Sequence, residues 1–128
     1  MKTTIRKLQP KDVPFMLKLI KDPSIKKFGR NRSLFSAKQY KEDLFSKKWI
    51  ICQNKVSVGA IRVYKGEVSV GVLSEHQRQG IAYNAINLLP IDDYWVKVER
   101  TNIASIKLFE KLGFKYDMCV EDYNVYKL

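Results

Sequence analysis

A polar loop with one glycine is the stretch of this sequence best suited to chemistry. Residues 77–82 read Gln-Arg-Gln-Gly-Ile-Ala, between an apolar run that ends at Leu73 and a helical pattern over residues 83–89 that Pro90 stops. The first N–H groups of a helix have no intrahelical acceptor and lie at the positive end of its dipole. Because Gly80 lets a ligand approach the backbone closely, the loop predicts a site for a phosphate-bearing cofactor.

The loop matches neither the glycine spacing of a dinucleotide-binding fingerprint nor the Gly-Lys-Ser/Thr of a Walker loop. It resembles the signature of the GCN5-related N-acetyltransferases, the GNAT family, written Arg/Gln-x-x-Gly-x-Gly/Ala. Gln77, Gly80 and Ala82 occupy the three defined positions. A helix-entry turn with a single glycine is the alternative interpretation of the hexapeptide by itself.

A second segment, residues 98–114, carries the other half of the resemblance. In the family a strand is followed by an Asn, then by a helix with a small residue three positions on and an ending E-K-x-G-F. The matching residues are Asn102, Ser105, Glu110, Lys111, Gly113 and Phe114. The resemblance implies an α+β GNAT fold for one domain over residues 1–128. Its mostly antiparallel central sheet would splay between strands 4 and 5 and be flanked by about four helices.

Hydrophobic periodicity and turn residues predict the individual elements. A first helix with Val13 and Ile20 on its apolar face is expected to end at Asp22-Pro23, and a basic loop to follow. A second helix is expected to open at Ser36. The predicted strands cover residues 3–8, 49–53, 56–64, 68–73, 94–98, 115–120 and 123–128, and two later helices cover residues 83–89 and 103–112.

The resemblance implies acetyl-CoA as cosubstrate. Its pantetheine arm is expected between the splayed strands, with Val72 as the principal contact, and its pyrophosphate on the loop amides. Gln77, Arg78 and Gln79 are expected to add side-chain donors. Asn102 would contact the pantetheine arm or serve only as a helix cap. The expected cofactor-binding residues are Val70, Val72, Leu73, Gln77, Arg78, Gln79, Gly80, Ile81, Ala82, Asn102, Ser105 and Phe109.

Direct acetyl transfer to a primary amine needs a base for the amine, and an acid can protonate the leaving thiolate. Phe109 stands where many family members carry a tyrosine acid, and phenylalanine has no proton to donate. Glu67 and Glu99, at the ends of two strands, are the candidate bases, with exposed structural carboxylates as the alternative. His76 is expected to be a surface loop residue.

Positive charge is concentrated in the first half of the chain. The net charge is +11, and residues 1–65 hold 17 of the 24 Lys/Arg but only 4 of the 13 Asp/Glu. In the family the first two helices border the acceptor site, where a basic cluster falls here: Lys26, Lys27, Arg30 and Arg32. We therefore expect an anionic amine acceptor, a nucleotide-linked amino sugar first. A solvated basic face is the alternative.

Two rival functions remain open at this stage. One is a GNAT-fold protein that binds acyl-CoA without turnover, and the other is a basic module that binds RNA or a ribosomal surface. Nucleic acid is not the expected partner because no nucleic-acid motif is present. With no apolar run of 18 residues, no metal-ligand spacing, and Cys52 and Cys119 expected as buried free thiols, we expect a cytoplasmic protein without metal or membrane contact. A homodimer through an edge strand is compatible with the sequence.

Overall fold

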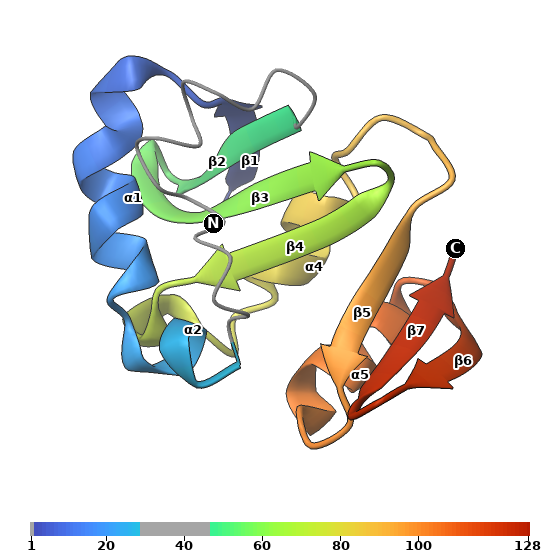
Figure 1. Cartoon of the computed structure of the whole chain (residues 1–128). Helices are drawn as coiled ribbons and strands as arrows, with labels where there is room; N and C mark the ends of the chain where they lie inside the picture. Colours follow the sequence, from blue (N-terminus) through green and yellow to red (C-terminus); the bar gives the residue numbers. More distant parts are fainter. Residues whose placement is uncertain (1, 29–46) are drawn as a thin grey trace.

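The computed structural model describes residues 2–28 and 47–128, which form a seven-stranded sheet with helices on both faces (Figure 1). The strands are β1 (Thr3–Lys7), β2 (Lys47–Gln53), β3 (Val56–Tyr64), β4 (Glu67–Val72), β5 (Trp95–Glu99), β6 (Lys115–Val120) and β7 (Tyr123–Lys127). The helices are α1 (Val13–Ile20), α2 (Pro23–Phe28), α4 (Ile81–Ile86) and α5 (Ile103–Lys111), with 3-10 turns η1 (Pro10–Asp12) and η2 (Ser74–His76). Arg30, Arg32 and the helix expected after Ser36 lie outside the described residues.

The strand order is β1-β2-β3-β4-β5-β7-β6, and two tight hairpins connect β2, β3 and β4. Asn54 and Lys55 have φ of 51° and 72°, and Lys65 and Gly66 have φ of 49° and 82°. Positive φ at both central residues is typical of type I′ turns, whose twist suits antiparallel strands. The meander predicted from the sequence is confirmed.

The sheet opens between β4 and β5, its only parallel neighbours within the described residues. Glu67 pairs with Trp95, and no second pair joins the two strands in that part of the chain. The Trp95 backbone N–H donates to the Gly66 carbonyl at 3.0 Å, and its Nε1 donates to the Lys65 carbonyl at 3.1 Å. From this point the two strands diverge toward their carboxyl ends (Figure 1). The predicted separation of strands 4 and 5 is confirmed.

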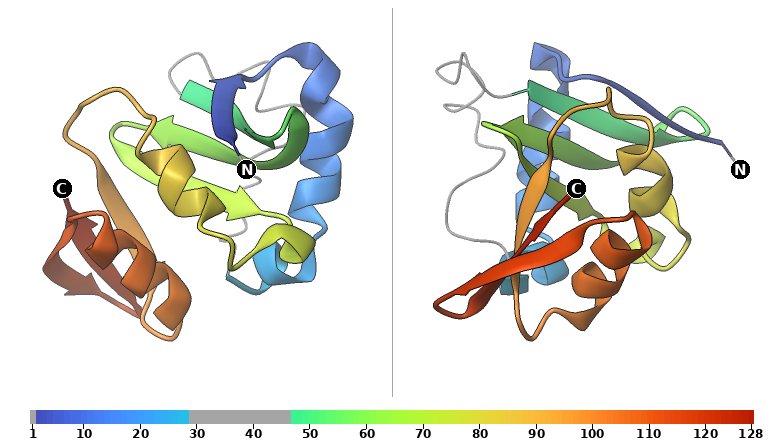
Figure 2. Two further views of the ribbon diagram at one scale, coloured as in Figure 1. Left: turned by 180° about the vertical axis from the view of Figure 1, so that it is seen from behind. Right: turned by 90° about the vertical axis from the view of Figure 1, so that its right-hand side faces the viewer.

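Figure 2 shows α1 and α2 on one face of the sheet and α4 and α5 on the other. Each face has its own apolar core. Met16 and Leu19 of α1 pack on the first, and Ile81 and Ala85 of α4 contribute to the second. A Cβ built on Gly71 would lie 2.8 Å from Ile25 Cδ1, so α2 lies directly against β4.

Three local predictions differ from the structure. Residues 23–28, expected as a loop, form α2, because Asp22 accepts from the Ser24 N–H at 3.0 Å and Pro23 stands at the first helical position. Helix α4 begins earlier and ends earlier than residues 83–89, because Gly80 with φ of 74° already starts it. Cys119 is exposed on β6 rather than buried, whereas Cys52 is buried as expected.

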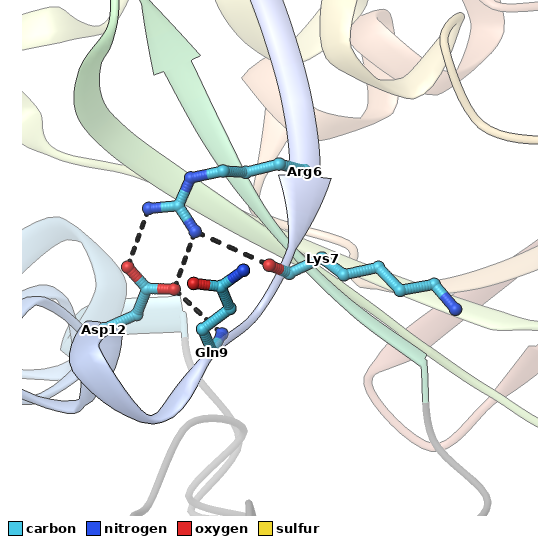
Figure 3. Close-up of polar contacts among 4 residues, drawn as sticks. All are labelled: Arg6, Lys7, Gln9 and Asp12. Atoms are coloured by element: carbon cyan, nitrogen blue, oxygen red, sulfur yellow. Dashed lines mark hydrogen bonds and ion pairs between the residues drawn. The ribbon is translucent and has the colours of Figure 1, made fainter.

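An ion pair fixes the junction between β1 and α1 (Figure 3). Two Arg6 nitrogens donate to the two Asp12 carboxylate oxygens at 2.8 Å each, and the Gln9 N–H donates to the same carboxylate at 2.9 Å. Asp12 is only 5% exposed. The hydrogen bond from Arg6 lowers the pKa of Asp12 below its ordinary value of 3.8, and burial opposes this shift. Asp12 therefore stays ionised and ties the first strand to the first helix.

Candidate active site

The backbone of β4 is unpaired on one side along its second half. The Leu73 N–H donates to the Val58 carbonyl at 2.9 Å. By alternation along the strand, the N–H and C=O groups of the odd-numbered β4 residues bond to β3. Hydrogen-bonded positions alternate in an antiparallel pair, so Val70 and Val72 direct their N–H and C=O groups away from β3, toward the side where β5 has diverged. We call the backbone groups of Val70 and the Val72 N–H the free edge of β4, since the Val72 carbonyl accepts from Gln77 Nε2 at 2.9 Å. An extended chain carrying amide groups can pair with such an edge.

Loop 77–80 continues from this edge and presents free backbone amides. The first bond into α4 runs from the Asn84 N–H to the Gly80 carbonyl at 3.0 Å, and the N–H groups of residues 78–83 have no acceptor among the described residues. Arg78 and Gly80 have φ of 63° and 74°. Among the described residues, a Cβ built on Gly80 would meet only Asn84 Nδ2, at 4.0 Å. Amide donors around open space fit a diphosphate.

The Gln77 side chain makes two hydrogen bonds that the sequence did not predict. Its Nε2 donates to Ser24 Oγ at 2.8 Å and to the Val72 carbonyl at 2.9 Å. An amide nitrogen carries two hydrogens, and both are engaged here. The side chain therefore points to α2 and β4. The Gln77 backbone N–H donates to the Ser74 carbonyl at 3.3 Å, so the phosphate donors of the loop begin at residue 78. Arg78 and Gln79 are exposed.

Sequence reasoning missed the acceptor group behind this arrangement, the Asp22 carboxylate. It accepts from the backbone N–H of Ser24 at 3.0 Å and of Ser74 at 2.9 Å, and from both serine hydroxyls. Burial raises the pKa of Asp22, but these four hydrogen bonds outweigh burial and lower it to about 2. The Asp-Pro-Ser sequence at residues 22–24 is a helix-cap signal that could have indicated part of this cluster.

The second signature segment forms a capped helix. Asn102 Oδ1 accepts from the Ser105 N–H at 3.3 Å, so the predicted capping role of Asn102 is confirmed. Phe109 is 4% exposed and packs edge-on against Phe114, with ring centroids 5.3 Å apart. Phe109 thus belongs to the core that α4 and α5 cover.

Both candidate bases project from the same face of the sheet. Glu67 pairs with Trp95, and Glu99 lies four residues further along β5, so alternation places both carboxylates on one side. It is the side of α1 and α2, because Gly71, four residues along β4 from Glu67 and so on the same face, lies against Ile25. Each glutamate is half-buried. Glu67 lies where β4 and β5 meet, and Glu99 lies where they are far apart.

Two cations lie on this face near the glutamates. Arg62 of β3 pairs with Ser69 of β4, and Lys97 lies between the positions of Trp95 and Glu99 on β5. The Lys97 ammonium is 4.7 Å from the Tyr123 ring centroid. Lys26 and Lys27 belong to α2, which covers the same face.

Residues 2–28 and 47–128 show neither a metal site nor a membrane span. No group of three or more His, Cys, Asp or Glu that could hold a metal ion occurs there. No helix in that part of the chain has the length and apolar character needed to cross a membrane. His76 is half-buried in η2, at the start of the loop.

Solved structures of low sequence identity share this fold. A domain from Methanocaldococcus jannaschii has a TM-score of 0.84 at 21% identity, covering 99% of this chain and 97% of that one. A spermidine N-acetyltransferase from Vibrio cholerae, in complex with CoA and spermine, has a TM-score of 0.79 at 18% identity, covering 98% and 92%. The ribosomal L7/L12 alpha-N-protein acetyltransferase RimL has a TM-score of 0.84 at 14% identity, covering 100% and 90%.

Sequence comparison identifies the family. No curated protein matches the chain. A family model described as an acetyltransferase (GNAT) domain matches residues 2–115, which include loop 77–80 and the capped helix α5. The chain therefore belongs to the GNAT acetyltransferases, enzymes that use acetyl-CoA as acyl donor.

Proposed function

We propose that this protein transfers the acetyl group of acetyl-CoA directly to a primary amine. The observation that carries the proposal is the free edge of β4, which leads through η2 to the amides of residues 78–83, none of which has an acceptor among the described residues. The diphosphate would lie on those amides and the pantetheine arm along the edge. The thioester would then point toward Glu67, where β4 and β5 meet. Acetyl-CoA turnover with release of the free thiol, measured against a panel of amines, tests this function.

We propose Glu67 rather than Glu99 as the base that accepts the amine proton. Glu67 lies at the end of β4 opposite the phosphate loop, whereas Glu99 lies at the end of β5 on the loop side. A base must reach the proton it removes, directly or through one water molecule. The position of Glu67 along the strand suits this requirement better.

No acid is assigned to the leaving thiolate. Phe109 is buried in the core and has no ionisable group, so it protonates nothing. A thiol has an ordinary pKa of about 8.5, so a thiolate is a good leaving group near neutral pH. The buried Phe109 is therefore compatible with turnover.

The acceptor that we propose is an amine attached to an anionic group, with a nucleotide-linked amino sugar first. The support is electrostatic: the net charge is +11, and Arg62 and Lys97 lie on the face that bears Glu67. A cationic polyamine would be repelled by such a surface, and an anionic amine would be attracted to it. UDP- and TDP-amino sugars, spermidine, and peptides with acidic or basic N-termini form the test panel. Preference for spermidine would contradict the charge argument.

Two measurements separate this proposal from its rivals. A coenzyme at 100 times its dissociation constant stabilises a folded protein by about 2.7 kcal/mol, so thermal unfolding with acetyl-CoA separates a coenzyme-binding protein from a module that binds RNA alone. Thiol release then separates an enzyme from a protein that binds acyl-CoA without turnover. A protein that acetyl-CoA stabilises but that releases no thiol with any amine would favour the protein that binds acyl-CoA without turnover.

We also propose that two copies pair along β6. All six residues of this edge strand are exposed, including Tyr116 at 58%, Met118 at 49% and Val120 at 40%. Exposed apolar edge strands pair readily with other chains. One of the similar solved structures, a spermidine N-acetyltransferase from Vibrio cholerae, is dodecameric. Light scattering should show a dimer for the wild type and a monomer for Met118→Lys. Val56→Lys is the control, since Val56 is a 58% exposed apolar residue of β3, and this variant should remain a dimer.

We place the protein in the cytoplasm. Cys52 and Cys119 are both free thiols, one buried and one exposed. Free thiols persist in a reducing compartment, where glutathione keeps them from forming disulfides. Thiol titration of the protein purified under anaerobic conditions should give two free thiols.

A further inference from the structure

A chain of polar side chains links the junction of α1 and α2 to loop 77–80, more than fifty residues away in the sequence. We propose that Asp22 is a positioning residue for acetyl transfer, which holds the end of β4 and the coenzyme loop in place through Ser24, Ser74 and Gln77. The inference rests on the proposed function, because it assigns the loop and the free edge of β4 to the coenzyme.

The link begins at the Asp22 carboxylate, which two segments of the chain share. One oxygen accepts from the Ser74 N–H at 2.9 Å, and the other accepts from the Ser24 N–H at 3.0 Å and its hydroxyl at 2.7 Å. The Ser74 hydroxyl also donates to this carboxylate. Hydrogen bonds to a charged acceptor are about twice as strong as those between neutral groups. Asp22 thus caps α2 and fixes the first residue of η2 with the same carboxylate.

The link continues through Ser24 to the free edge. Ser24 Oγ gives its proton to Asp22 and accepts one from Gln77 Nε2 at 2.8 Å, and the second Nε2 hydrogen goes to the Val72 carbonyl at 2.9 Å. Val72 is the last residue of β4 and the last of the free edge. The chain of hydrogen bonds therefore sets both where the edge ends and how the loop leaves it.

This arrangement requires a carboxylate. An asparagine at position 22 would offer one acceptor oxygen in place of two and would point an NH₂ group at donors from Ser24 or Ser74. Against the opposing effect of burial, the hydrogen bonds from Ser24 and Ser74 lower the pKa of Asp22 to about 2, so the carboxylate is ionised throughout the physiological pH range. The negative charge is already bound by four donors, which limits its repulsion of a coenzyme phosphate.

Substitutions along the link test the inference through the KM for acetyl-CoA. We expect Asp22→Asn and Gln77→Ala each to raise KM about tenfold, with a smaller effect on kcat, because each removes hydrogen bonds that hold the loop. Ser74→Ala, which leaves the cap on α2 intact, should raise KM about threefold. Gln77→Arg, unlike Gln77→Ala, should keep the KM for acetyl-CoA near the wild-type value, because a guanidinium has N–H donors for both Ser24 and Val72.

Asp12→Asn is the matched control. Asp12 also anchors α1 through charged hydrogen bonds, but it lies at the N-terminal end of that helix and its partner is Arg6 of β1. The Asp12→Asn variant should have a lower free energy of unfolding and an unchanged KM for acetyl-CoA. Equal KM values in wild type, Asp22→Asn and Gln77→Ala would overturn the inference, as would a rise of the same size in Asp12→Asn. If Asp22→Asn does not fold, the Gln77→Ala and Gln77→Arg pair decides the question.

Amide hydrogen exchange without any ligand separates this inference from the proposed function. Faster exchange over residues 74–80 in Asp22→Asn than in Asp12→Asn is expected whether or not the protein turns over acetyl-CoA. A wild-type protein with no affinity for acetyl-CoA would overturn the proposed function, and the catalytic part of this inference with it. An active wild type whose residues 74–80 exchange equally in both variants would overturn the inference alone.

Discussion

The two ends of β4 differ in what they offer. At the first end Glu67 is paired with Trp95, and its side chain projects toward α1 and α2. At the other end Val72 offers its backbone N–H, and the chain continues through η2 to loop 77–80. A strand rises about 3.3 Å per residue, so about 16 Å separates the two ends. Proton transfer and coenzyme binding should therefore respond to different substitutions.

Replacement of the base should have the largest effect. Glu67→Gln keeps the shape of the side chain and removes its basicity, so kcat should fall at least about 100-fold while the KM for acetyl-CoA stays constant. Steady-state thiol release at saturating amine measures both constants. Glu99→Gln is the control and should change kcat less than about threefold. A similar loss in both variants, or a loss in neither, would remove the assignment of Glu67.

A change remote from both ends of β4 should affect stability alone. Asp12→Asn removes an acceptor from the Arg6 guanidinium and should lower the free energy of unfolding by about 2 kcal/mol. Since the pKa of Asp12 is lowered on folding, its contribution is complete above pH 3.8 and is lost as the pH falls below that value. Urea unfolding between pH 7 and pH 2 should therefore show a weaker pH dependence in the variant. An unchanged pH dependence would contradict the ion pair.

A methyl group at the loop should weaken coenzyme binding. Gly80 has φ of 74°, and within the part of the chain that the structure describes its Cβ would meet only Asn84 Nδ2, at 4.0 Å. Gly80→Ala should raise the dissociation constant of CoA about tenfold and lower stability by about 1 kcal/mol. Gly113→Ala is the control, since Gly113 has φ of 96° and an uncrowded Cβ position 3.8 Å from Leu128. Gly113→Ala should lower stability by the same amount, and isothermal titration calorimetry should show an unchanged affinity for CoA.

The smallest effect should come from the paired end of β4. Trp95→Phe removes the hydrogen bond from Nε1 to the Lys65 carbonyl and should cost about 1 kcal/mol of stability. Affinity for CoA should not change, because the free edge lies at the other end of the strand. A weaker affinity would mean that the separation of β4 and β5 depends on this contact.

Local sequence signals predicted most of the elements near the site. Asn102 caps α5 because a side-chain oxygen before a helix can accept a backbone N–H, and Gly80 starts α4 because it adopts positive φ at little cost. The separation of β4 and β5 came from the family resemblance, because periodicity carries no information on how two strands diverge.

What the sequence did not reveal depends on distant partners. The orientation of Gln77 is decided by Ser24, 53 residues away, and the capping role of Asp22 was hidden because Asp-Pro marks a helix end as readily as a helix start. The residues around Cys119 form a strand pattern, which led to the prediction of a buried thiol. The pattern does not show that β6 is the edge strand of the sheet, where Cys119 is exposed.

The free edge of β4 also bears on how the protein can change over evolutionary time. The groups through which we propose that it binds the coenzyme belong to the main chain, and every residue except proline supplies an N–H, so drift at Val70 or Val72 that keeps the strand would keep this surface. The similar solved structures retain the fold at 14% to 21% identity. Selection on such a surface would act on strand geometry and tolerate wide variation in side chains, so a new amine specificity could evolve without rebuilding the coenzyme site.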